Sequence, residues 1–177
     1  MLIIRKVKKV IYKLTMRDCM PLLVEEYRES GMKIGGGARI FSRINSAEPY
    51  LIEIGDNVTI STNVNLITHD NSAIKCFEDG TDFVGKISIG NNCFIGSGAI
   101  ILPGVSIAEN VIVGSGSVVT KSITKPGTVI AGNPAHEIGS VKDIQIKRKE
   151  NVFDFKGKTS GQKKNEILIN ESKWIVK

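Results

Sequence analysis

A six-residue rhythm of branched apolar side chains runs through the middle of the chain. Between residues 89 and 123 an isoleucine or valine stands at every sixth position, and a small or apolar residue follows each of them four places later. The six ladder positions are Ile89, Ile95, Ile101, Ile107, Val113 and Val119, and their partners are Cys93, Ala99, Val105, Val111, Ser117 and Ile123. A period of six fits neither an α-helix nor a lone strand, whereas hexapeptide repeats are typical of a parallel β-helix.

The repeat extends toward the N-terminus, with two interruptions. Earlier units begin at Ile34, Ile40, Ile54, Ile60 and Leu66. The segment 46–50 breaks the register, and the polar stretch 68–86 carries no hexapeptide pattern, so it is predicted to be a long loop that leaves the helix. Ala131 and Ala135 are expected to continue the phase. Three units close a coil of about eighteen residues, so the count predicts an all-β solenoid of about five coils.

Segments of different character flank the repeat. Apolar residues at helical spacing among lysines predict an amphipathic helix over residues 3–14, and a second helix is expected from Pro21 to Ser30. The stretch 157–165 is predicted to be a flexible loop, and the apolar groups on either side of it indicate short strands or a packing arm. The predicted organisation is an N-terminal helical segment (1–33), a β-helix domain (34–139) and a basic C-terminal extension (140–177).

The net charge of +6 is concentrated at the two ends. Residues 1–20 hold six basic residues and one acidic residue. Residues 141–177 hold ten basic and five acidic residues, whereas residues 21–140 hold eight basic and twelve acidic residues. A nucleic-acid-binding protein usually places basic residues on its folded recognition surface, so no nucleic-acid partner is predicted. Solvated ends explain the distribution, and attraction to a phosphate-bearing ligand is an alternative. For the amphipathic helix, a weak membrane-surface contact is the alternative to docking on its own domain.

The remaining composition indicates a cytoplasmic protein. No apolar run approaches the ~20 residues of a membrane span, and the basic start lacks the apolar stretch of a signal peptide. Cys19, Cys76 and Cys93 are odd in number and widely spaced, which indicates reduced thiols rather than a disulfide framework.

His69 is the main candidate for chemistry. It lies in the long loop at the edge of a rigid solenoid, and an imidazole is the natural general base at neutral pH. Asp70 and Asn71 are neighbours that could orient an acceptor or the imidazole. A lone loop histidine that is merely exposed to solvent is the competing interpretation. Only His69 and His136 exist, so a zinc enzyme with three histidine ligands is disfavoured and no metal is predicted.

Several motifs resemble those of the left-handed β-helix acyltransferases. They are the Thr–His pair before the IG-x-x-x-x-IG run, the VVTK element at 118–121 and the GNPA ending at 132–135. Within this family the chain is similar to the maltose/galactoside and the capsular or lipopolysaccharide O-acetyltransferases, over residues 34–138. The resemblance implies a homotrimer that uses acetyl-CoA, with active sites between subunits.

The resemblance also implies roles for individual residues. His69 matches the catalytic base, and Asn65 lies in the region that lines the acceptor pocket. Asp70 and Asn71 are candidate acceptor contacts because they are neighbours of His69 in the sequence. The positions that match the acetyl-CoA groove are Phe94, Gly96, Ser97, Gly114, Ser115, Thr120, Lys121 and Pro134. Lys121 is the expected phosphate partner. The glycines and serines have a competing explanation, because any hexapeptide coil needs such residues at its corners.

Two positions depart from the family pattern. Phe94 stands where close relatives often have Trp, and His136 stands where Lys or Arg usually follows GNPA. The second change weakens the expected phosphate contact unless Lys142, Lys147 or Arg148 replaces it.

The function that follows is direct acetyl transfer from acetyl-CoA to a hydroxyl, most simply of a sugar, with His69 as general base and no covalent enzyme intermediate. Transfer to an antibiotic or to the nitrogen of an amino sugar is the alternative within the enzyme class. A non-catalytic solenoid scaffold is the alternative outside it. The acceptor, the length of the acyl group, the oxyanion donor and the role of the C-terminal extension do not follow from the sequence.

Overall fold

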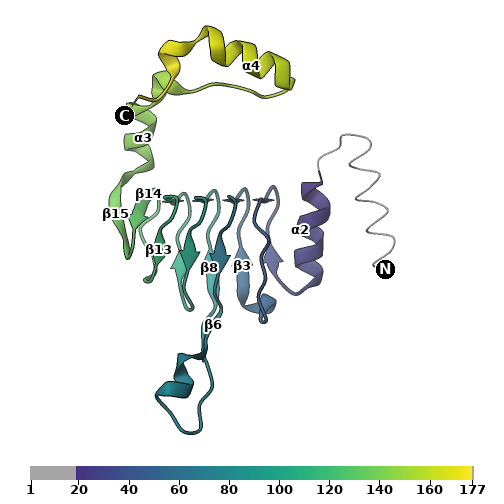
Figure 1. Cartoon of the computed structure of the whole chain (residues 1–177), viewed down its shortest axis with the longest axis vertical. Coiled ribbons are helices and arrows are strands. Elements are labelled where there is room, and N and C mark those ends of the chain that lie inside the picture. Colours follow the sequence, from purple (N-terminus) through teal and green to yellow (C-terminus); the bar gives the residue numbers. More distant parts are fainter. Residues whose placement is uncertain (1–18, 177) are drawn as a thin grey trace. The chain divides into compact units, whose positions relative to one another are not determined.

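Short strands in three sheets form the framework of the first of the two units into which the chain divides, residues 1–139 and 140–177 (Figure 1). The structure, a computed structural model, describes residues 19–176. Sheet I contains β1 (Lys33–Ile34), β3 (Ile52–Ile54), β8 (Ile87–Ile89) and β11 (Ser106–Ile107) in this order. Sheet II contains β2 (Arg39–Ile40), β4 (Thr59–Ile60), β9 (Phe94–Ile95), β12 (Ile112–Val113), β14 (Thr128–Gly132) and β15 (Ala135–Ser140). Sheet III contains β5 (Asn65–Leu66), β10 (Ile100–Ile101) and β13 (Val118–Val119).

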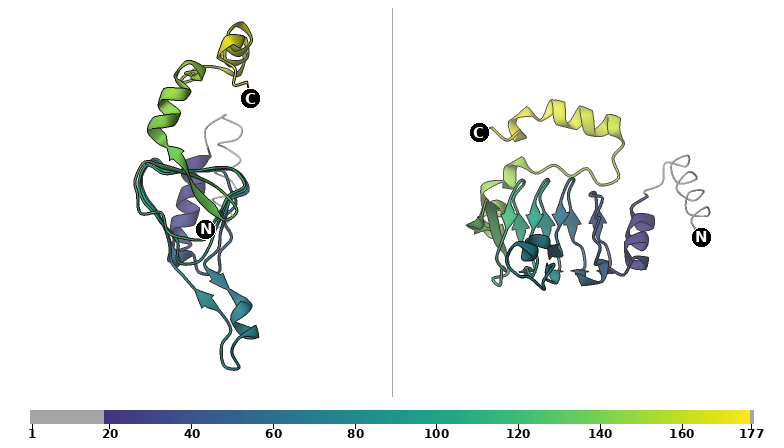
Figure 2. Two further views of the ribbon diagram at one scale, coloured as in Figure 1. Left: turned by 90° about the vertical axis from the view of Figure 1, so that its left-hand side faces the viewer. Right: turned by 60° about the horizontal axis from the view of Figure 1, so that its bottom comes forward.

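The chain visits the three sheets in turn, and the coils superpose when viewed along the stack (Figure 2, left). Ladder residues six apart in sequence therefore point inward from three different sheets, and those eighteen apart lie in register on one sheet. Ile89 pairs with Ile107 in sheet I, Ile95 with Val113 in sheet II, and Ile101 with Val119 in sheet III. All six are at most 3% exposed, which confirms the predicted ladder as the core.

The prediction that Ala131 and Ala135 continue the six-residue repeat, as a ladder residue and its partner, is wrong. The coil after Val119 is short, so the inward positions are taken by Ile123, which bridges to Ile107, and by Ile130, which pairs with Val113. Ile130 is fully buried, whereas Ala131 is only partly buried. Ile123 lies 16 residues after its partner Ile107 and Ile130 lies 17 after Val113, against 18 from Ile101 to Val119. Two residues are therefore lost between Val119 and Ile123, before Lys125, and one is regained before Ile130.

Helix α2 (Met20–Glu29) packs beside β1 and β2 at the start of the β-helix, which confirms the helix predicted over 21–30. Pro21 lies in its first turn and Gly31, with φ of +112°, follows its end. Val24 and Tyr27 are buried in the common core. The helix thereby covers apolar side chains that the first coil would otherwise expose. The helix predicted over 3–14 lies outside the described residues.

The polar stretch 68–86 is a hairpin that projects from the β-helix (Figure 1). Its antiparallel arms are β6 (His69–Asp70) and β7 (Phe83–Val84), and the 3-10 helix η2 (Asn71–Lys75) follows the first arm. Phe77 and Phe83 make an edge-to-face contact, with ring centroids 6.1 Å apart. The loop predicted here is thus an ordered excursion with its own packing.

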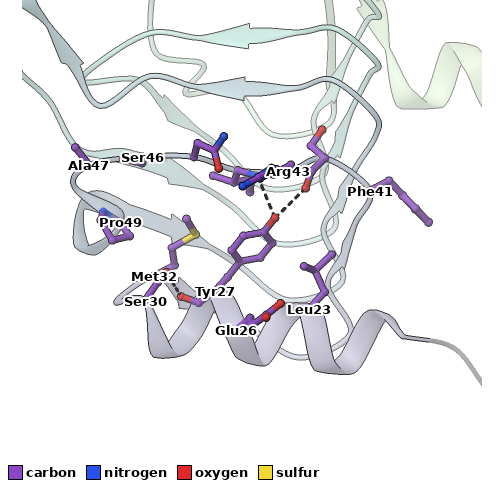
Figure 3. A pocket seen from close by; sticks show the side chains of 13 residues that line it. Leu23, Glu26, Tyr27, Ser30, Met32, Phe41, Arg43, Ser46, Ala47 and Pro49 are labelled. Atoms are coloured by element: carbon purple, nitrogen blue, oxygen red, sulfur yellow. Dashed lines mark hydrogen bonds between the residues drawn. The ribbon is translucent and has the colours of Figure 1, made fainter. Parts of the chain in front are cut away.

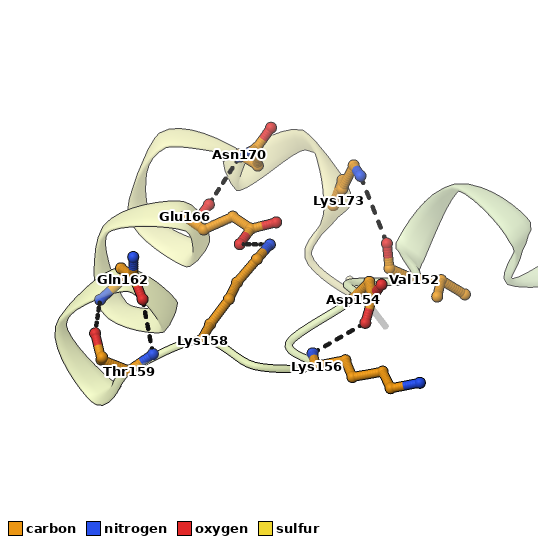
Figure 4. Close-up of polar contacts among 9 residues, drawn as sticks. All are labelled: Val152, Asp154, Lys156, Lys158, Thr159, Gln162, Glu166, Asn170 and Lys173. Atoms are coloured by element: carbon orange, nitrogen blue, oxygen red, sulfur yellow. Dashed lines mark hydrogen bonds and ion pairs between the residues drawn. The ribbon is translucent and has the colours of Figure 1, made fainter.

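The C-terminal unit is helical, so the expectation of strands is wrong. It contains α3 (Val141–Lys147), η3 (Lys149–Asn151), α4 (Ser160–Ile169) and η4 (Glu171–Lys173). Helix α4 begins inside the stretch predicted to be a flexible loop, because Thr159 and Gln162 form a reciprocal capping box (Figure 4). Lys158 pairs with Glu166, and Asn170 caps the carbonyl of Glu166 (Figure 4). None of its residues through Val176 is buried.

The core assignment predicts unequal effects of two isoleucines on one strand. Ile101→Ala, which empties an inward position with 0% exposure, should destabilise the protein by about 2–5 kcal/mol. Ile100→Ala, on the outer side of the same strand, is the matched control and should cost about 1 kcal/mol or less. Urea denaturation at one protein concentration measures both. Equal losses would contradict the assignment of Ile101 to the interior.

Candidate active site

The two interruptions of the repeat fall at the same corner of successive coils. Each lies between sheet III and sheet I: the segment 46–50 leads from Ile44 into β3, and the hairpin leads from β5 into β8. Inward residues cannot be displaced without opening the core, so extra residues leave the helix at a corner. Stacking of coils then places segments about twenty residues apart against each other. We refer to this position as the III–I corner.

At this corner His69 is bonded to Glu48. The imidazole Nδ1 lies 2.8 Å from Glu48 Oε2, and the same oxygen accepts a hydrogen bond of 2.7 Å from the hydroxyl of Thr68. Ser46 completes the cluster, because its hydroxyl lies 2.8 Å from the Thr68 hydroxyl and accepts from the Glu48 amide at 3.1 Å. Thr68 is 2% exposed. The histidine is therefore held by a carboxylate that the Thr68 hydroxyl fixes, and Ser46 in turn bonds this hydroxyl and the Glu48 backbone.

The pair shifts the titration of both groups. The hydrogen bond and the charge of Glu48 raise the pKa of His69, against a smaller opposite effect of desolvation. The hydrogen bonds from His69 and Thr68 lower the pKa of Glu48. An ionised carboxylate only accepts hydrogen bonds, so Nδ1 of His69 carries the proton that it donates to Glu48. In the neutral imidazole Nε2 is then unprotonated and can accept a proton from a substrate.

A small cavity of about 190 Å³ lies next to His69. Asn65 from β5 lines it together with residues 43–47, so the structure brings two of the predicted site residues, His69 and Asn65, to one cavity. The side chain of Asn65 is exposed, and its one contact among residues 19–176 is a long hydrogen bond of 3.4 Å to the carbonyl of Asn63. Its amide is therefore available to a ligand.

Asp70 and Asn71 have structural tasks in the hairpin. The Asp70 carboxylate caps η2 by accepting from the Ser72 amide at 2.9 Å, which lowers the Asp70 pKa. The Asn71 amide donates to the Thr81 carbonyl at 2.8 Å and to Asp82 at 3.2 Å, which ties the two arms together. Both side chains are exposed, and their binding of an acceptor stays a prediction.

The residues predicted to hold acetyl-CoA lie at two different corners of one chain. Gly96, Ser97, Gly114 and Ser115 follow strands of sheet II and stack on one another at the corner with sheet III, where the Gly116 amide donates to the Ser97 carbonyl at 2.8 Å. Pro134 follows β14, and Phe94 on β9 is 43% exposed. Thr120 and Lys121 follow β13 at the III–I corner, and both are exposed.

Two of these glycines are explained by packing between coils. A Cβ on Gly96 would lie 2.6 Å from the amide nitrogen of Ser115, and one on Gly114 would lie 2.9 Å from the Cβ of Ala131. Real Cβ atoms do not approach so closely, so both positions need glycine whatever binds there. The same close stacking leaves an edge of backbone without side chains.

Glu48 is the site residue that sequence reasoning missed. It lies 21 residues before His69, in a segment with no periodic pattern of its own. The signal that could have found it is the register break at 46–50. An interruption that falls about one coil before a candidate histidine must be stacked against it. Among residues 19–176 no group of three or more His, Cys, Asp or Glu is placed to hold a metal ion, and no helix is long and apolar enough to cross a membrane.

Comparison with known proteins agrees with this architecture. The family model "Bacterial transferase hexapeptide (six repeats)" matches residues 86–121. Protein CapG of Staphylococcus aureus is 40% identical over 172 residues, which cover 94% of this chain and 96% of CapG. The chain belongs to the hexapeptide-repeat acetyltransferases, a family of acyltransferase enzymes built on a left-handed β-helix.

Three solved structures of this family are similar to the chain. A maltose O-acetyltransferase from Clostridium difficile 630 has a TM-score of 0.56 at 35% identity, over 62% of this chain and 59% of its own. A galactoside acetyltransferase in complex with coenzyme A has a TM-score of 0.57 at 34% identity, over 73% of this chain and 62% of its own. A hexapeptide-repeat acetyltransferase from Vibrio cholerae in complex with acetyl-CoA has a TM-score of 0.56 at 28% identity, over 64% of this chain and 62% of its own. The match thus spans about three fifths of each of these proteins.

The His69–Glu48 pair predicts a shift in the pH profile. A general base works in its neutral form, and Glu48 raises the pKa at which His69 loses its proton. Glu48→Gln should therefore move the acid limb of the kcat/KM profile to lower pH, toward the ordinary histidine value near 6.5. It should also lower the plateau by about 100-fold or more, since the imidazolium formed in the reaction loses its partner.

Glu53→Gln is the matched control for this prediction. Glu53 is also a carboxylate with a lowered pKa, but its partners are Lys33 and Lys86 rather than the histidine. Its substitution should leave the acid limb in place. An unchanged limb in Glu48→Gln would show that the carboxylate does not set the protonation of the base.

Proposed function

We propose that this protein transfers an acetyl group from acetyl-CoA to a hydroxyl group of a sugar, with His69 as the general base. The observation that carries the proposal is the 2.8 Å bond between His69 and Glu48 beside an open polar cavity, on the scaffold of a hexapeptide-repeat acetyltransferase. A merely exposed loop histidine has no need of a buried threonine hydroxyl that fixes its partner. The galactoside and maltose acetyltransferases among the similar structures support a sugar acceptor.

His69 moves one proton in each half of the reaction. Nε2 accepts the proton of the acceptor hydroxyl as that oxygen attacks the thioester carbonyl, and Glu48 stabilises the imidazolium that results. When the tetrahedral intermediate collapses, the C–S bond breaks and the imidazolium returns the proton to the departing thiolate. The products are the acetyl ester and free coenzyme A, so base and carboxylate end as they began.

A homotrimer would complete the donor site. One chain carries the predicted donor residues at two corners, with Gly96, Ser97, Gly114 and Ser115 at one and Thr120 and Lys121 at the other. A groove between neighbouring copies can bring the glycines and serines of one chain next to Thr120 and Lys121 of the neighbouring chain. We place the pantetheine arm against the side-chain-free backbone at the glycines, Phe94 and Pro134 along its rim, and Lys121 near the phosphates.

Further elements of the proposal concern the whole molecule. We propose that the β-helix has about five coils. We also propose that the protein is located in the cytoplasm. Exposed apolar side chains on the hairpin, Phe77 and Val84 among them, are in place to contact a neighbouring copy, being 58% and 59% exposed. Contact of the N-terminal helix with a membrane surface stays a prediction, because that segment lies outside the described residues.

The central test is acetyl transfer by a His69→Ala variant. Purified protein is incubated with acetyl-CoA and a panel of sugars, amino sugars and antibiotics, and release of the coenzyme A thiol is followed. The substitution should lower kcat by about 100- to 10,000-fold, the usual contribution of a general base. Binding of coenzyme A, measured by calorimetry, should persist.

His136→Ala is the matched control, since His136 is the chain's second histidine, is exposed and is bonded only weakly to the Pro134 carbonyl at 3.4 Å. It should keep near-normal kcat. Turnover that survives in His69→Ala would refute the histidine mechanism. Transfer to antibiotics or amines in place of sugars would favour the alternative acceptors, and no binding of coenzyme A would favour a non-catalytic scaffold.

A lysine pair tests the donor assignment. Lys121→Ala should raise the KM for acetyl-CoA about tenfold, because a charge-assisted contact to phosphate is lost, and should leave kcat close to normal. Lys125→Ala is the control, because Lys125 is an exposed lysine nearby that pairs with Glu137 at 2.8 Å. Steady-state kinetics with varied acetyl-CoA measures both. Equal effects of the two variants would contradict a specific role for Lys121.

A further inference from the structure

A second and larger hollow adjoins the cavity at His69. It has a volume of about 900 Å³ and lies between α2 and the irregular segment that follows β2 (Figure 3). Residues 43–47 line both hollows, so this short segment is the wall between the catalytic histidine and the larger groove. A groove of this size is in the range of sites that take small organic ligands. A molecule at His69 can therefore extend along the wall.

The wall is rigid. The hydroxyl of the buried Tyr27 donates to the Ser42 carbonyl at 3.1 Å and accepts from the Ile44 amide at 3.0 Å (Figure 3). The Ser42 hydroxyl in turn donates to the Ser61 carbonyl and accepts from the Val64 amide at 2.7 Å. The two residues that flank Arg43 are thereby tied both to the helix and to the next coil.

This anchoring aims Arg43 outward. Ser42 and Ile44 are buried, whereas Phe41, Arg43 and Asn45 are exposed, as in a strand with alternating sides. Within residues 19–176 the Arg43 guanidinium has no ion pair and no hydrogen bond. The lining of the large groove contains one carboxylate, Glu26, and that residue has an interaction of its own. A guanidinium that is unpaired within the described part of the chain thus stands between the two hollows.

On the basis of the proposed acetyl transfer, we infer that the acceptor is an extended sugar that carries an anionic group, a carboxylate or a phosphate, and that Arg43 binds this group. The hydroxyl that reacts lies at His69 in the small cavity, and the rest of the acceptor follows the wall into the groove. A guanidinium presents parallel N–H donors that match either anion. Asn65 and Asn45 supply neutral polar contacts along the same path.

The position of Arg43 assigns it to the acceptor rather than to the phosphates of acetyl-CoA. Arg43 belongs to the first coil and the groove reaches back toward α2. The predicted donor residues all follow the hairpin, between Phe94 and Pro134, in later coils. His69 lies between the two sets along the stack. Donor and acceptor would then approach the histidine from opposite ends.

Lactobionate and lactitol are suitable probes, because both keep an intact galactose ring and differ in one carboxylate in place of one CH2OH group. For the wild-type protein kcat/KM should be about 10- to 100-fold higher with lactobionate, as expected for a charged hydrogen bond. Arg43→Gln should bring this ratio close to one, mainly through a fall in kcat/KM for lactobionate, with the KM for acetyl-CoA close to that of the wild type. Arg43→Lys, which keeps the charge, should retain part of the preference.

Arg39→Gln is the matched control. Arg39 is exposed on the preceding strand, packs over the ring of Phe41 at 5.3 Å and lines neither hollow, so the preference should survive its loss. Equal use of both probes by the wild type would refute the inference and leave acetyl transfer to sugars standing. A rise in the KM for acetyl-CoA in Arg43→Gln would assign the arginine to the donor instead. Transfer to no sugar at all would refute the proposed function, and this inference with it.

Discussion

Burial of the isoleucine and valine ladder is the constraint on which the rest of the structure depends. The regular coils each deliver one inward residue to each of three sheets, and these residues are almost fully excluded from solvent. Insertions are therefore expelled at corners, and parallel stacking sets expelled segments of successive coils against each other. The break at 46–50 and the hairpin at 68–86 both leave at the III–I corner. The packing of the core thereby places Glu48 next to His69, although the core residues themselves take no part in the proposed reaction.

The β-helix could be predicted from the sequence because its period is a direct record of its packing. The ladder from Ile89 to Val119, the helix before the first coil and the existence of a long excursion with His69 all follow from pattern and turn residues. Features that depend on one contact between distant segments could not be predicted in the same way. The contact between Glu48 and His69 exists only because the coils are stacked. The inward positions beyond Val119 are shifted because the last coil is shorter than the others. Helix α4 was hidden because its start, set by Thr159 and Gln162, lies in a stretch that is polar and glycine-containing.

In the proposed reaction, the regular coils bind the donor and the irregular segments bind the acceptor. Rigid corners such as those at Gly96 and Gly114 present backbone that a long, flexible donor can follow, and the same closeness of coils explains why these positions are glycine. The acceptor side is built differently, from an irregular wall held by Tyr27 that carries an outward Arg43, which has no hydrogen bond or ion pair within residues 19–176. A uniform solenoid therefore gains specificity where the repeat fails, and the relatives that share the helix can differ in the acceptor they take.

The most direct measurement is a crystal structure of the assembled protein with coenzyme A and a bound acceptor. We expect a reacting hydroxyl about 2.6–3.2 Å from Nε2 of His69, with Nδ1 still bonded to Glu48. The thiol of coenzyme A should lie on the opposite side of that hydroxyl. An acceptor bound away from His69, or an imidazole turned from Glu48 in the ternary complex, would contradict the role of His69 as general base.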